Sequence, residues 1–327
     1  MPPVVIDVIN DFRAGLLRAE QTQMAEAARR WLGVEQALQA QADALSQWMA
    51  GDGHVTRVEH LMQSRRWQEL QRQVDVEMRK YSTYLDGRIV DGQRNMALNA
   101  ISHSQATINA ISTEAQIVVP FNRLPTSAVE NMIGLAGDGS PVRALLDEAA
   151  AAGPDAMAQE LVNGIALGRN PLEVARRAIR QGLGQSFTRM ATIARTEQLR
   201  VYRETTLQSY RAGGVVVGYR RLSARDRRVC PGCLMADGRF YPLDHTFDQH
   251  PNCRCAAVPV LRDVPRTEYE TGQQWFRRQP ENTQRAILGR GRFEAWATGR
   301  ATLDDMVAVR TDDTWGDAIV PVRVSDL

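Results

Sequence analysis

The sequence predicts a mainly α protein of the α+β class, with long N-terminal helices, a helical domain bearing a small β hairpin, and a short helical C-terminal tail. Apolar residues recur at helical spacing through most of the chain. A short run rich in β-branched residues follows Gly213-Gly214, and all four cysteines lie between residues 230 and 255. A chain of 327 residues, 43% of them hydrophobic, has the length for about two or three domains.

The first 120 residues are expected to form an extended helical region that docks on a partner. The spacing of Trp31, Val34 and Leu38 is typical of one face of a helix. Helices are expected over residues 5–49, 67–85 and 95–116. The second should return along the first after the break at Gly51 and Gly53, so that their apolar faces bury against each other or against a partner.

Residues 121–262 are expected to form the second domain, and residues 263–327 the helical tail. Pro120 and Pro125 interrupt the helical pattern before the second domain. A further boundary is expected around Ala152-Gly153-Pro154, for the same reason. In the tail, the spacing of the large apolar residues is helical.

A carboxylate is expected to face inward in the second domain. A helix should begin at Asn170-Pro171, which supply an N-cap residue and a proline at the first helical position, and the next should run from about 186 to 211. In that helix Glu197 falls on the apolar face. A buried carboxylate needs a partner, and three arginines are close in sequence: Arg195, Arg200 and Arg203. A structural ion pair is therefore expected, with a catalytic carboxylate as the alternative.

The hairpin is expected from residues 215–222 and from the turn signal Asp237-Gly238. Asp226, Arg228 and Cys230 alternate, so on an extended segment their side chains would share one face. Asp226 should then pair with Arg228 or with an arginine of the preceding helix, and fix the hairpin to the helix of Glu197.

The cysteines and one histidine have the spacing of a zinc site. Two cysteines stand two residues apart, and a His-x2-Cys-x-Cys group follows sixteen residues later. The candidate ligands are Cys230, Cys233, His250, Cys253 and Cys255. Because zinc takes four ligands, the second pair is either His250 with one later cysteine, or both later cysteines with His250 outside the coordination shell. A structural Zn²⁺ that staples the hairpin is expected.

Other interpretations of the cluster remain open at this point. The four cysteines could form two disulfides or stay as reduced thiols, and a catalytic zinc would use three protein ligands and leave one position to water. No run of residues reaches the roughly 18 to 20 apolar residues of a membrane span, and the N-terminus lacks a basic signal region. A reducing compartment is therefore expected, which favours metal ligands over disulfides.

The order of these motifs resembles the head-morphogenesis domain of the Mu F-like phage minor head proteins. The resemblance covers about residues 155 to 260. It is carried by Ala194-Arg195-Thr196-Glu197, by Asp226-x-Arg228-x-Cys230-Pro231-x-Cys233, and by His250-Pro251-Asn252-Cys253-Arg254-Cys255. The tail, with Gln274-Trp275-Phe276 and Leu288-Gly289-Arg290, is similar to the segment that often follows.

The resemblance implies a minor head protein of a tailed phage or prophage with a structural role in prohead assembly. Its implied partners are the portal protein and the major capsid or scaffold proteins, with DNA as a candidate during packaging or ejection. Its implied location is the virion, in the head interior or at the portal vertex, after assembly in the host cytoplasm. The signature positions carried over are Arg195, Glu197, Asp226 and Arg228. No enzyme is expected, since nucleophile elbow, P-loop and zinc-protease motifs are absent from the sequence.

A zinc-ribbon nucleic-acid-binding protein is the alternative function. Several arginines crowd one end of the expected hairpin: Arg220, Arg221, Arg225, Arg227 and Arg228. The net charge of +2 favours neither function, because phosphate binding depends on clustered rather than total charge.

Overall fold

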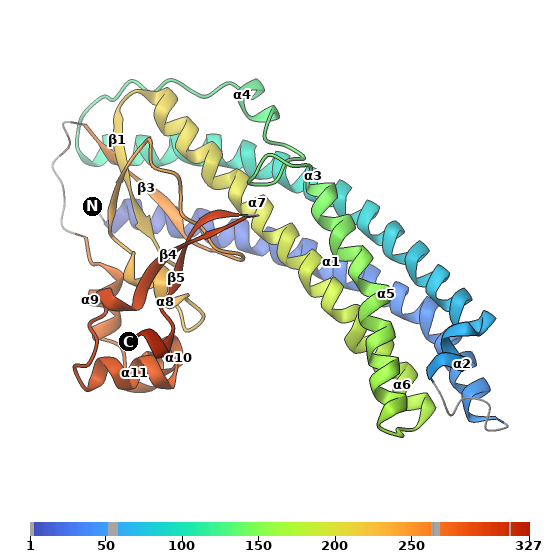
Figure 1. The fold of residues 1–327 in the computed structure, drawn as a ribbon. Helices are drawn as coiled ribbons and strands as arrows, with labels where there is room; N and C mark the ends of the chain where they lie inside the picture. Colours follow the sequence, from blue (N-terminus) through green and yellow to red (C-terminus); the bar gives the residue numbers. More distant parts are fainter. Residues whose placement is uncertain (1–2, 52–57, 263, 265–268, 314) are drawn as a thin grey trace. The chain divides into compact units, whose positions relative to one another are not determined.

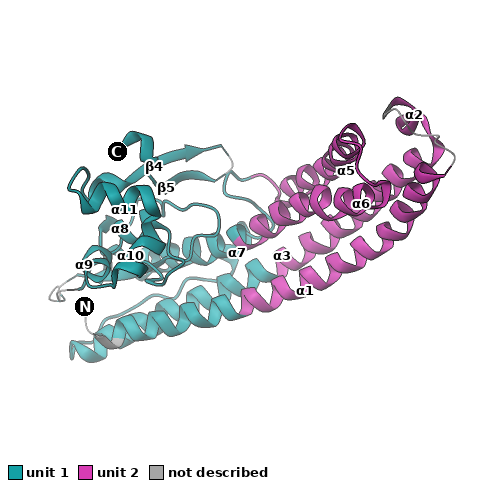
Figure 2. Ribbon diagram, turned by 90° about the horizontal axis from the view of Figure 1, so that it is seen from below, with its two compact units in different colours: residues 1–18, 92–139, 196–327 teal, residues 19–91, 140–195 magenta. Residues whose placement is uncertain are grey.

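The computed structural model describes residues 3–51, 58–262, 264, 269–313 and 315–327, and the chain divides into two units. Unit 1 comprises residues 1–18, 92–139 and 196–327, and unit 2 comprises residues 19–91 and 140–195 (Figure 2). Figure 1 labels the three longest helices: α1, Pro3–Ala50; α3, Arg65–Glu114; and α7, Gly184–Gly213. Each of them contributes to both units (Figure 2). Neither unit is one consecutive range of the chain, and the three consecutive domains expected from the sequence stay a prediction.

In unit 2, α3 returns along α1. The hydroxyl of Tyr81 donates a hydrogen bond to the carbonyl of Ala27 at 3.1 Å, and the Tyr81 ring meets Trp31 edge-on at 5.1 Å. The expectation of separate helices over 67–85 and 95–116 was wrong, because α3 is continuous over 50 residues. Gly87 and Gly92 are isolated glycines within the apolar pattern of α3. A helix with a continuous apolar face tolerates single glycines, so neither ends the helix. The expected break at Gly53 lies outside the described residues.

The rest of unit 2 is helical. It contains α2, Val58–Gln63; α5, Val142–Ala166; α6, Pro171–Arg177; a π-helical turn η1, Ala178–Leu183; and the start of α7. The boundary expected at Ala152-Gly153-Pro154 was wrong, since Pro154 lies inside α5. Buried side chains on both sides of the proline, including Ala150 and Met157, hold the helix across it. Asn170 is the N-cap of α6, as the sequence predicts, and its Oδ1 accepts from the Leu172 amide at 2.9 Å.

Unit 1 contains a three-stranded antiparallel sheet in the order β2-β1-β3. Its strands are β1, Val216–Leu222; β2, Phe240–Pro242; and β3, Ala256–Leu261. Tyr219, in the central strand, lies opposite Tyr241 on β2 and Pro259 on β3. The Asp237-Gly238 pair does not form the hairpin loop that the sequence predicts. Residues 223–239 connect β1 to β2 and include a short helix α8, Pro231–Met235, which Gly238 follows at φ 85°.

The C-terminal part of unit 1 combines helices with a second sheet. The helices are α9, Gly272–Arg277; α10, Glu281–Leu288; and α11, Arg290–Ala297. Their buried residues include Phe276, Leu288 and Phe293, which share one core with Leu234 of α8. A second antiparallel sheet follows these helices. It consists of β4, Val307–Asp312, and β5, Gly316–Pro321, and the sequence did not predict it. Short elements complete the chain: α4, Ser127–Glu130; η2, Asp304–Met306; and η3, Val324–Asp326.

The predicted fold class is confirmed: long N-terminal helices precede a helical region that bears a small sheet and the Cys/His cluster. Among the described residues, none of the helices has the length and apolar character needed to cross a membrane.

Candidate metal centre

Two turns present the cysteines and the histidine. Cys230 is the N-cap of α8, with Pro231 at the first helical position, so Cys233 lies one turn further along that helix. The second turn begins at His250, whose carbonyl accepts from the Cys253 amide at 3.0 Å. Asn252 in this turn has φ 62°, a left-handed conformation that asparagine tolerates better than most residues. Local turn geometry therefore places both groups of donors.

The donors form two overlapping triads that share Cys233. The ligand atoms of Cys230, Cys233 and His250 lie within 4.8 Å of one another, and so do the sulfurs of Cys233, Cys253 and Cys255. Cys233 Sγ lies 3.9 Å from Cys253 Sγ and 3.1 Å from His250 Nε2. All four cysteines are free thiols in this structure, and all but Cys230 are buried.

The histidine directs its Nε2 toward the cysteines. His250 Nδ1 lies 2.7 Å from the carbonyl oxygen of Pro251, which can only accept a hydrogen bond. With Nδ1 as the donor to this carbonyl, Nε2, which lies 3.1 Å from Cys233 Sγ, is the ring nitrogen available to bind a metal. A backbone acceptor on the distal nitrogen is the usual way in which a zinc-binding histidine is oriented.

The residues fit a zinc ion. Thiolates and imidazole are the preferred donors of Zn²⁺, and the 3.9 Å spacing of two sulfurs is close to the roughly 3.8 Å expected at tetrahedral zinc. Cys233 belongs to both triads, so an ion held by either triad would have it as a ligand, and the other positions would fall to members of Cys230, His250, Cys253 and Cys255. Bound there, zinc would cross-link the α8 turn to the turn at residues 250–255 and supply folding energy.

Charge around the thiols is predominantly positive. Arg221, whose side chain is among the largest fully buried ones, places Nη2 3.5 Å from the sulfurs of Cys233 and Cys253. Burial by itself lowers the pKa of Arg221, but the neighbouring cysteines outweigh burial and raise it. The hydrogen bond to Cys233 lowers the pKa of Cys230 to about 4, and His250 acts in the same direction against the effect of burial. The hydrogen bond with Cys233 also lowers the pKa of Cys253, whereas the hydrogen bond with Cys230 raises the pKa of Cys233.

Glu197 is buried, as predicted from its place on the apolar face of α7, and both of its oxygens accept hydrogen bonds. Arg200 Nε donates to Oε2 at 2.7 Å, and Trp315 Nε1 donates to Oε1 at 3.0 Å. Burial raises the pKa of Glu197, and Arg200 opposes the shift. Of the three arginines considered from the sequence, Arg200 is the partner of Glu197 in this structure.

The other signature residues are engaged elsewhere. Arg195 belongs to unit 2, where it pairs with Glu20 at 2.6 Å. Asp226 lies in a bend rather than on an extended segment, so the expected alternation of side chains was wrong. Its carboxylate pairs with both terminal nitrogens of Arg254, at 2.7 and 2.9 Å. Arg228 contributes only its backbone amide to Asp226, at 2.8 Å.

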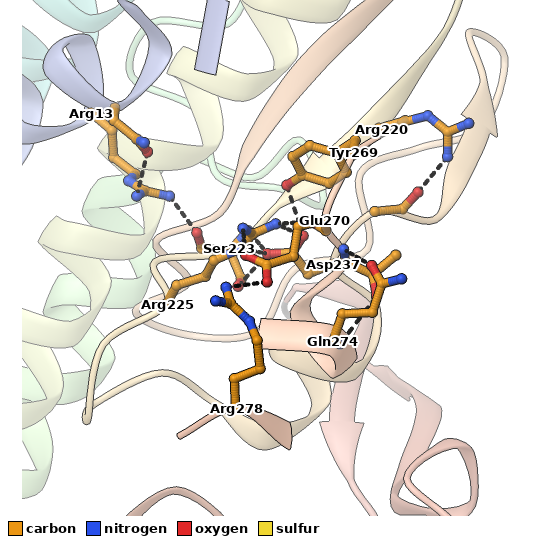
Figure 3. A network of polar contacts seen from close by, with 12 residues as sticks. Arg13, Arg220, Ser223, Arg225, Asp237, Tyr269, Glu270, Gln274 and Arg278 are labelled. Carbon is orange, nitrogen blue, oxygen red and sulfur yellow. Dashed lines mark hydrogen bonds and ion pairs between the residues drawn. The ribbon is translucent and has the colours of Figure 1, made fainter. Parts of the chain in front are cut away.

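The arginines considered for nucleic-acid binding do not share one exposed face. Arg221 is buried among the thiols, whereas Arg227 is exposed. Arg225 donates two hydrogen bonds to the buried Asp237, at 3.0 and 2.9 Å (Figure 3). Arg220 donates to the carbonyl of Gly238 at 2.6 Å.

Asp237 is the centre of a polar network that the sequence analysis read only as a turn signal. Besides Arg225, the amide and hydroxyl of Ser223 donate to it at 2.9 and 2.6 Å, and the hydroxyl of Tyr269 donates at 2.8 Å (Figure 3). The network ties the connection between β1 and β2 to the segment that precedes α9. No local pattern in the sequence indicates it, because Tyr269 lies 32 residues away.

The C-terminal sheet packs directly on the α8 turn. A Cβ added at Gly232 would lie 2.9 Å from the backbone carbon of Val320 and 3.1 Å from Ile319 Cγ2. The amide of Gln249 donates to the carbonyl of Asp317 at 3.2 Å. The α8 turn and the residue that precedes the second turn therefore both contact β5, and the glycine between Cys230 and Cys233 allows the close approach.

Comparison with protein-family models matches residues 155–258 to the family described as phage Mu protein F like protein. Neither the curated proteins nor the solved structures contain a match to the chain. The matched range includes Glu197, Asp226 and every member of the Cys/His cluster, whereas α9, α10, α11 and the C-terminal sheet follow it. The match indicates a role in phage head morphogenesis. The resemblance drawn from the sequence is thus confirmed, and residues 155–258 of this chain form a Mu F-like segment.

Proposed function

We propose that this chain is a minor head protein of a tailed phage or prophage, with a structural role in prohead formation together with the portal protein. The observation that carries the proposal is that the Mu F-like match spans the segment that builds the Cys/His cluster and the buried Glu197. The contacts of Glu197 support a structural role over a catalytic one, since Arg200 and Trp315 occupy both carboxylate oxygens.

A structural Zn²⁺ is part of the proposal. Its proposed ligands are drawn from Cys230, Cys233, His250, Cys253 and Cys255. Support comes from the two donor triads, from the orientation of His250 Nε2 toward Cys233, and from the burial of Cys233, Cys253 and Cys255. The ion would hold together the α8 turn and the turn at residues 250–255 and would add folding energy.

The proposed partners are the portal and the major capsid or scaffold proteins, with the long helices α1 and α3 as the docking region. The proposed location is the virion, in the head interior or at the portal vertex. Contact with DNA during packaging or ejection is a further part of the proposal. The candidates are the exposed Arg227 and the half-buried Arg220, since Arg221 is buried and Arg225 pairs with the buried Asp237.

Quantitative mass spectrometry of purified proheads and mature particles tests this function. The chain is expected at a few copies per particle, in a fixed ratio to the portal subunit. Its absence from both kinds of particle, in a source that produces them, would contradict a minor head protein and favour the nucleic-acid-binding alternative. That alternative predicts DNA binding that weakens steeply with salt and is lost when Arg220 and Arg227 are replaced by glutamine.

A further inference from the structure

Two arginines are buried beside the thiols without a carboxylate partner. Arg203 and Arg221 are 2% and 1% exposed, and within the ranges that the structure describes neither forms an ion pair with Asp or Glu. Arg203 donates to Gln249 Oε1 and, at 3.0 Å, to the carbonyl of Cys253. Arg221 donates to the carbonyl of Asp248 at 2.7 Å and directs Nη2 at two sulfurs.

One nitrogen of Arg221 is unsatisfied among the described residues. Its Nε is buried, and no hydrogen-bond partner is found for it in the described part of the chain. Arginine does not lose its proton in proteins, so the charge of both side chains persists in the interior. A buried cation is tolerated only beside a compensating negative charge, and the nearest groups able to carry one are the sulfurs of the centre.

The charge of a zinc–thiolate centre matches this requirement. Cysteine binds zinc as the thiolate, so three or four cysteine ligands leave Zn²⁺ with one or two excess negative charges. The two guanidinium groups supply two positive charges beside the cluster. In addition, N–H donors directed at a ligand sulfur orient it and reduce its charge.

We propose that Arg221 and Arg203 are positioning residues of the metal centre, which they hold by balancing its thiolate charge and by fixing its ligands. This inference rests on the proposed zinc. Arg221 bridges the sulfurs of Cys233 and Cys253, which come from the two different turns. Arg203 holds the second turn through Gln249 and the carbonyl of Cys253. The α7 helix and the central strand β1 thereby take part in metal binding without supplying a ligand.

The chain offers a matched control on the same strand. Arg220 precedes Arg221 in β1, is half-buried, and donates to the carbonyl of Gly238 rather than to a sulfur. The substitution Arg220→Met therefore removes the same charge and donors from β1 without touching the centre.

The test is a zinc competition titration of the full-length chain against a chromophoric chelator, with far-UV circular dichroism at saturating zinc as the check of folding. Arg221→Met is expected to weaken zinc binding about 10-fold to 100-fold. Arg203→Met should weaken it less, because no donor to sulfur is lost. Arg221→Lys should lie between Arg221→Met and the wild type, since a point charge replaces the bidentate fork. Arg220→Met should bind zinc as the wild type does.

Cobalt substitution gives a second readout that general destabilisation does not move. The thiolate-to-cobalt charge-transfer band should shift in Arg221→Lys and Arg221→Met, because a hydrogen-bond donor to two ligand sulfurs has been changed, and should stay in place in Arg220→Met.

The outcomes separate this inference from the proposed function. If Arg221→Met binds zinc as tightly as the wild type and leaves the band unshifted, the inference is overturned while the zinc centre stands. If Arg221→Met does not fold at saturating zinc, the other two variants decide. The inference is then overturned when both Arg221→Lys and Arg203→Met bind zinc with the affinity of the wild type. A wild-type chain that binds no zinc overturns both the zinc centre and the inference. The head-morphogenesis role is not affected by that result, because mass spectrometry of proheads and mature particles tests it separately.

Discussion

Trp315 Nε1 donates a hydrogen bond to Oε1 of Glu197 at 3.0 Å, and so joins the turn of the C-terminal β4–β5 hairpin to the middle of α7. The carboxylate of Glu197 is buried, and its second oxygen is held by Arg200. A segment outside the Mu F-like range thus satisfies a carboxylate inside it. The C-terminal hairpin is on this account a structural part of unit 1 rather than an independent appendage.

The substitution Trp315→Phe tests this contact. Phenylalanine keeps an aromatic ring but removes the N–H that Glu197 accepts, so the free energy of unfolding should fall by about 1–2 kcal/mol. Urea denaturation of the full chain measures it. Val309→Thr, at a residue of the same hairpin that is 59% exposed, should change the value by less than about 0.5 kcal/mol. Equal losses in the two variants would argue against a specific role of the indole N–H.

The raised pKa of Glu197 predicts how stability depends on pH. Burial favours the protonated form of Glu197 in the folded chain. Glu197 therefore contributes its full stabilisation of the folded state below the ordinary glutamate pKa of about 4.5, and this contribution is lost as the pH rises through the raised pKa of Glu197. Glu197→Gln does not titrate. Between pH 4.5 and 7.5 the melting temperature of the wild type should therefore fall relative to that of Glu197→Gln. A difference that is flat, or that changes in the opposite direction, would contradict the buried carboxylate.

The position of Glu197 was predictable from the sequence, but its partner Trp315 was not. Helical periodicity places Glu197 between Ile193 and Val201 on an apolar face, and burial then requires a donor. Arg200 is available because it lies three residues away on the same helix. Trp315 is 118 residues distant, and no local pattern indicates a contact over that separation. The hairpin that carries it was missed because the helical spacing of Trp275 and Leu288 was extended to the whole tail.

A double-mutant cycle tests the pair of Asp226 and Arg254. The carboxylate and guanidinium form two hydrogen bonds but are partly exposed, so the coupling between Asp226→Asn and Arg254→Met should be about 1 kcal/mol. Arg228→Met is the matched control, because Asp226 contacts only the backbone of Arg228. Its coupling to Asp226→Asn should be close to zero. A larger coupling to Arg228 than to Arg254 would restore the pairing first expected from the sequence.

The close packing of Gly232 against β5 predicts the effect of an added methyl group. In Gly232→Ala the new Cβ would meet backbone atoms of Val320, which cannot move without displacing the strand, so the free energy of unfolding should fall by about 1–3 kcal/mol. Gly87→Ala is the control. Gly87 is exposed inside α3 with no atom near its added Cβ, and the same substitution should stabilise the chain by about 0.5–1 kcal/mol. A Gly232→Ala chain as stable as the wild type would show that β5 does not pack there as described.

The ligand types of the metal centre could be predicted from the sequence, and the surrounding charges could not. Cys-x2-Cys and His-x2-Cys spacings follow from what a turn can present to one ion, so local sequence suffices for the donors. Arg221 was read as a surface arginine of a hairpin because alternation along a strand does not reveal which side faces a cluster formed by distant turns. Arg203 was considered only as a partner of Glu197, since its neighbours Gln249 and Cys253 lie about 50 residues away.

The metal content of the full-length chain, purified without chelator and measured by native mass spectrometry, tests the central claim most directly. The account predicts one zinc per chain, its loss in Cys233→Ser because Cys233 belongs to both donor triads, and a melting temperature that falls when the ion is removed. A wild-type chain that carries no zinc after incubation with the ion, and that melts at the same temperature as Cys233→Ser, would contradict it.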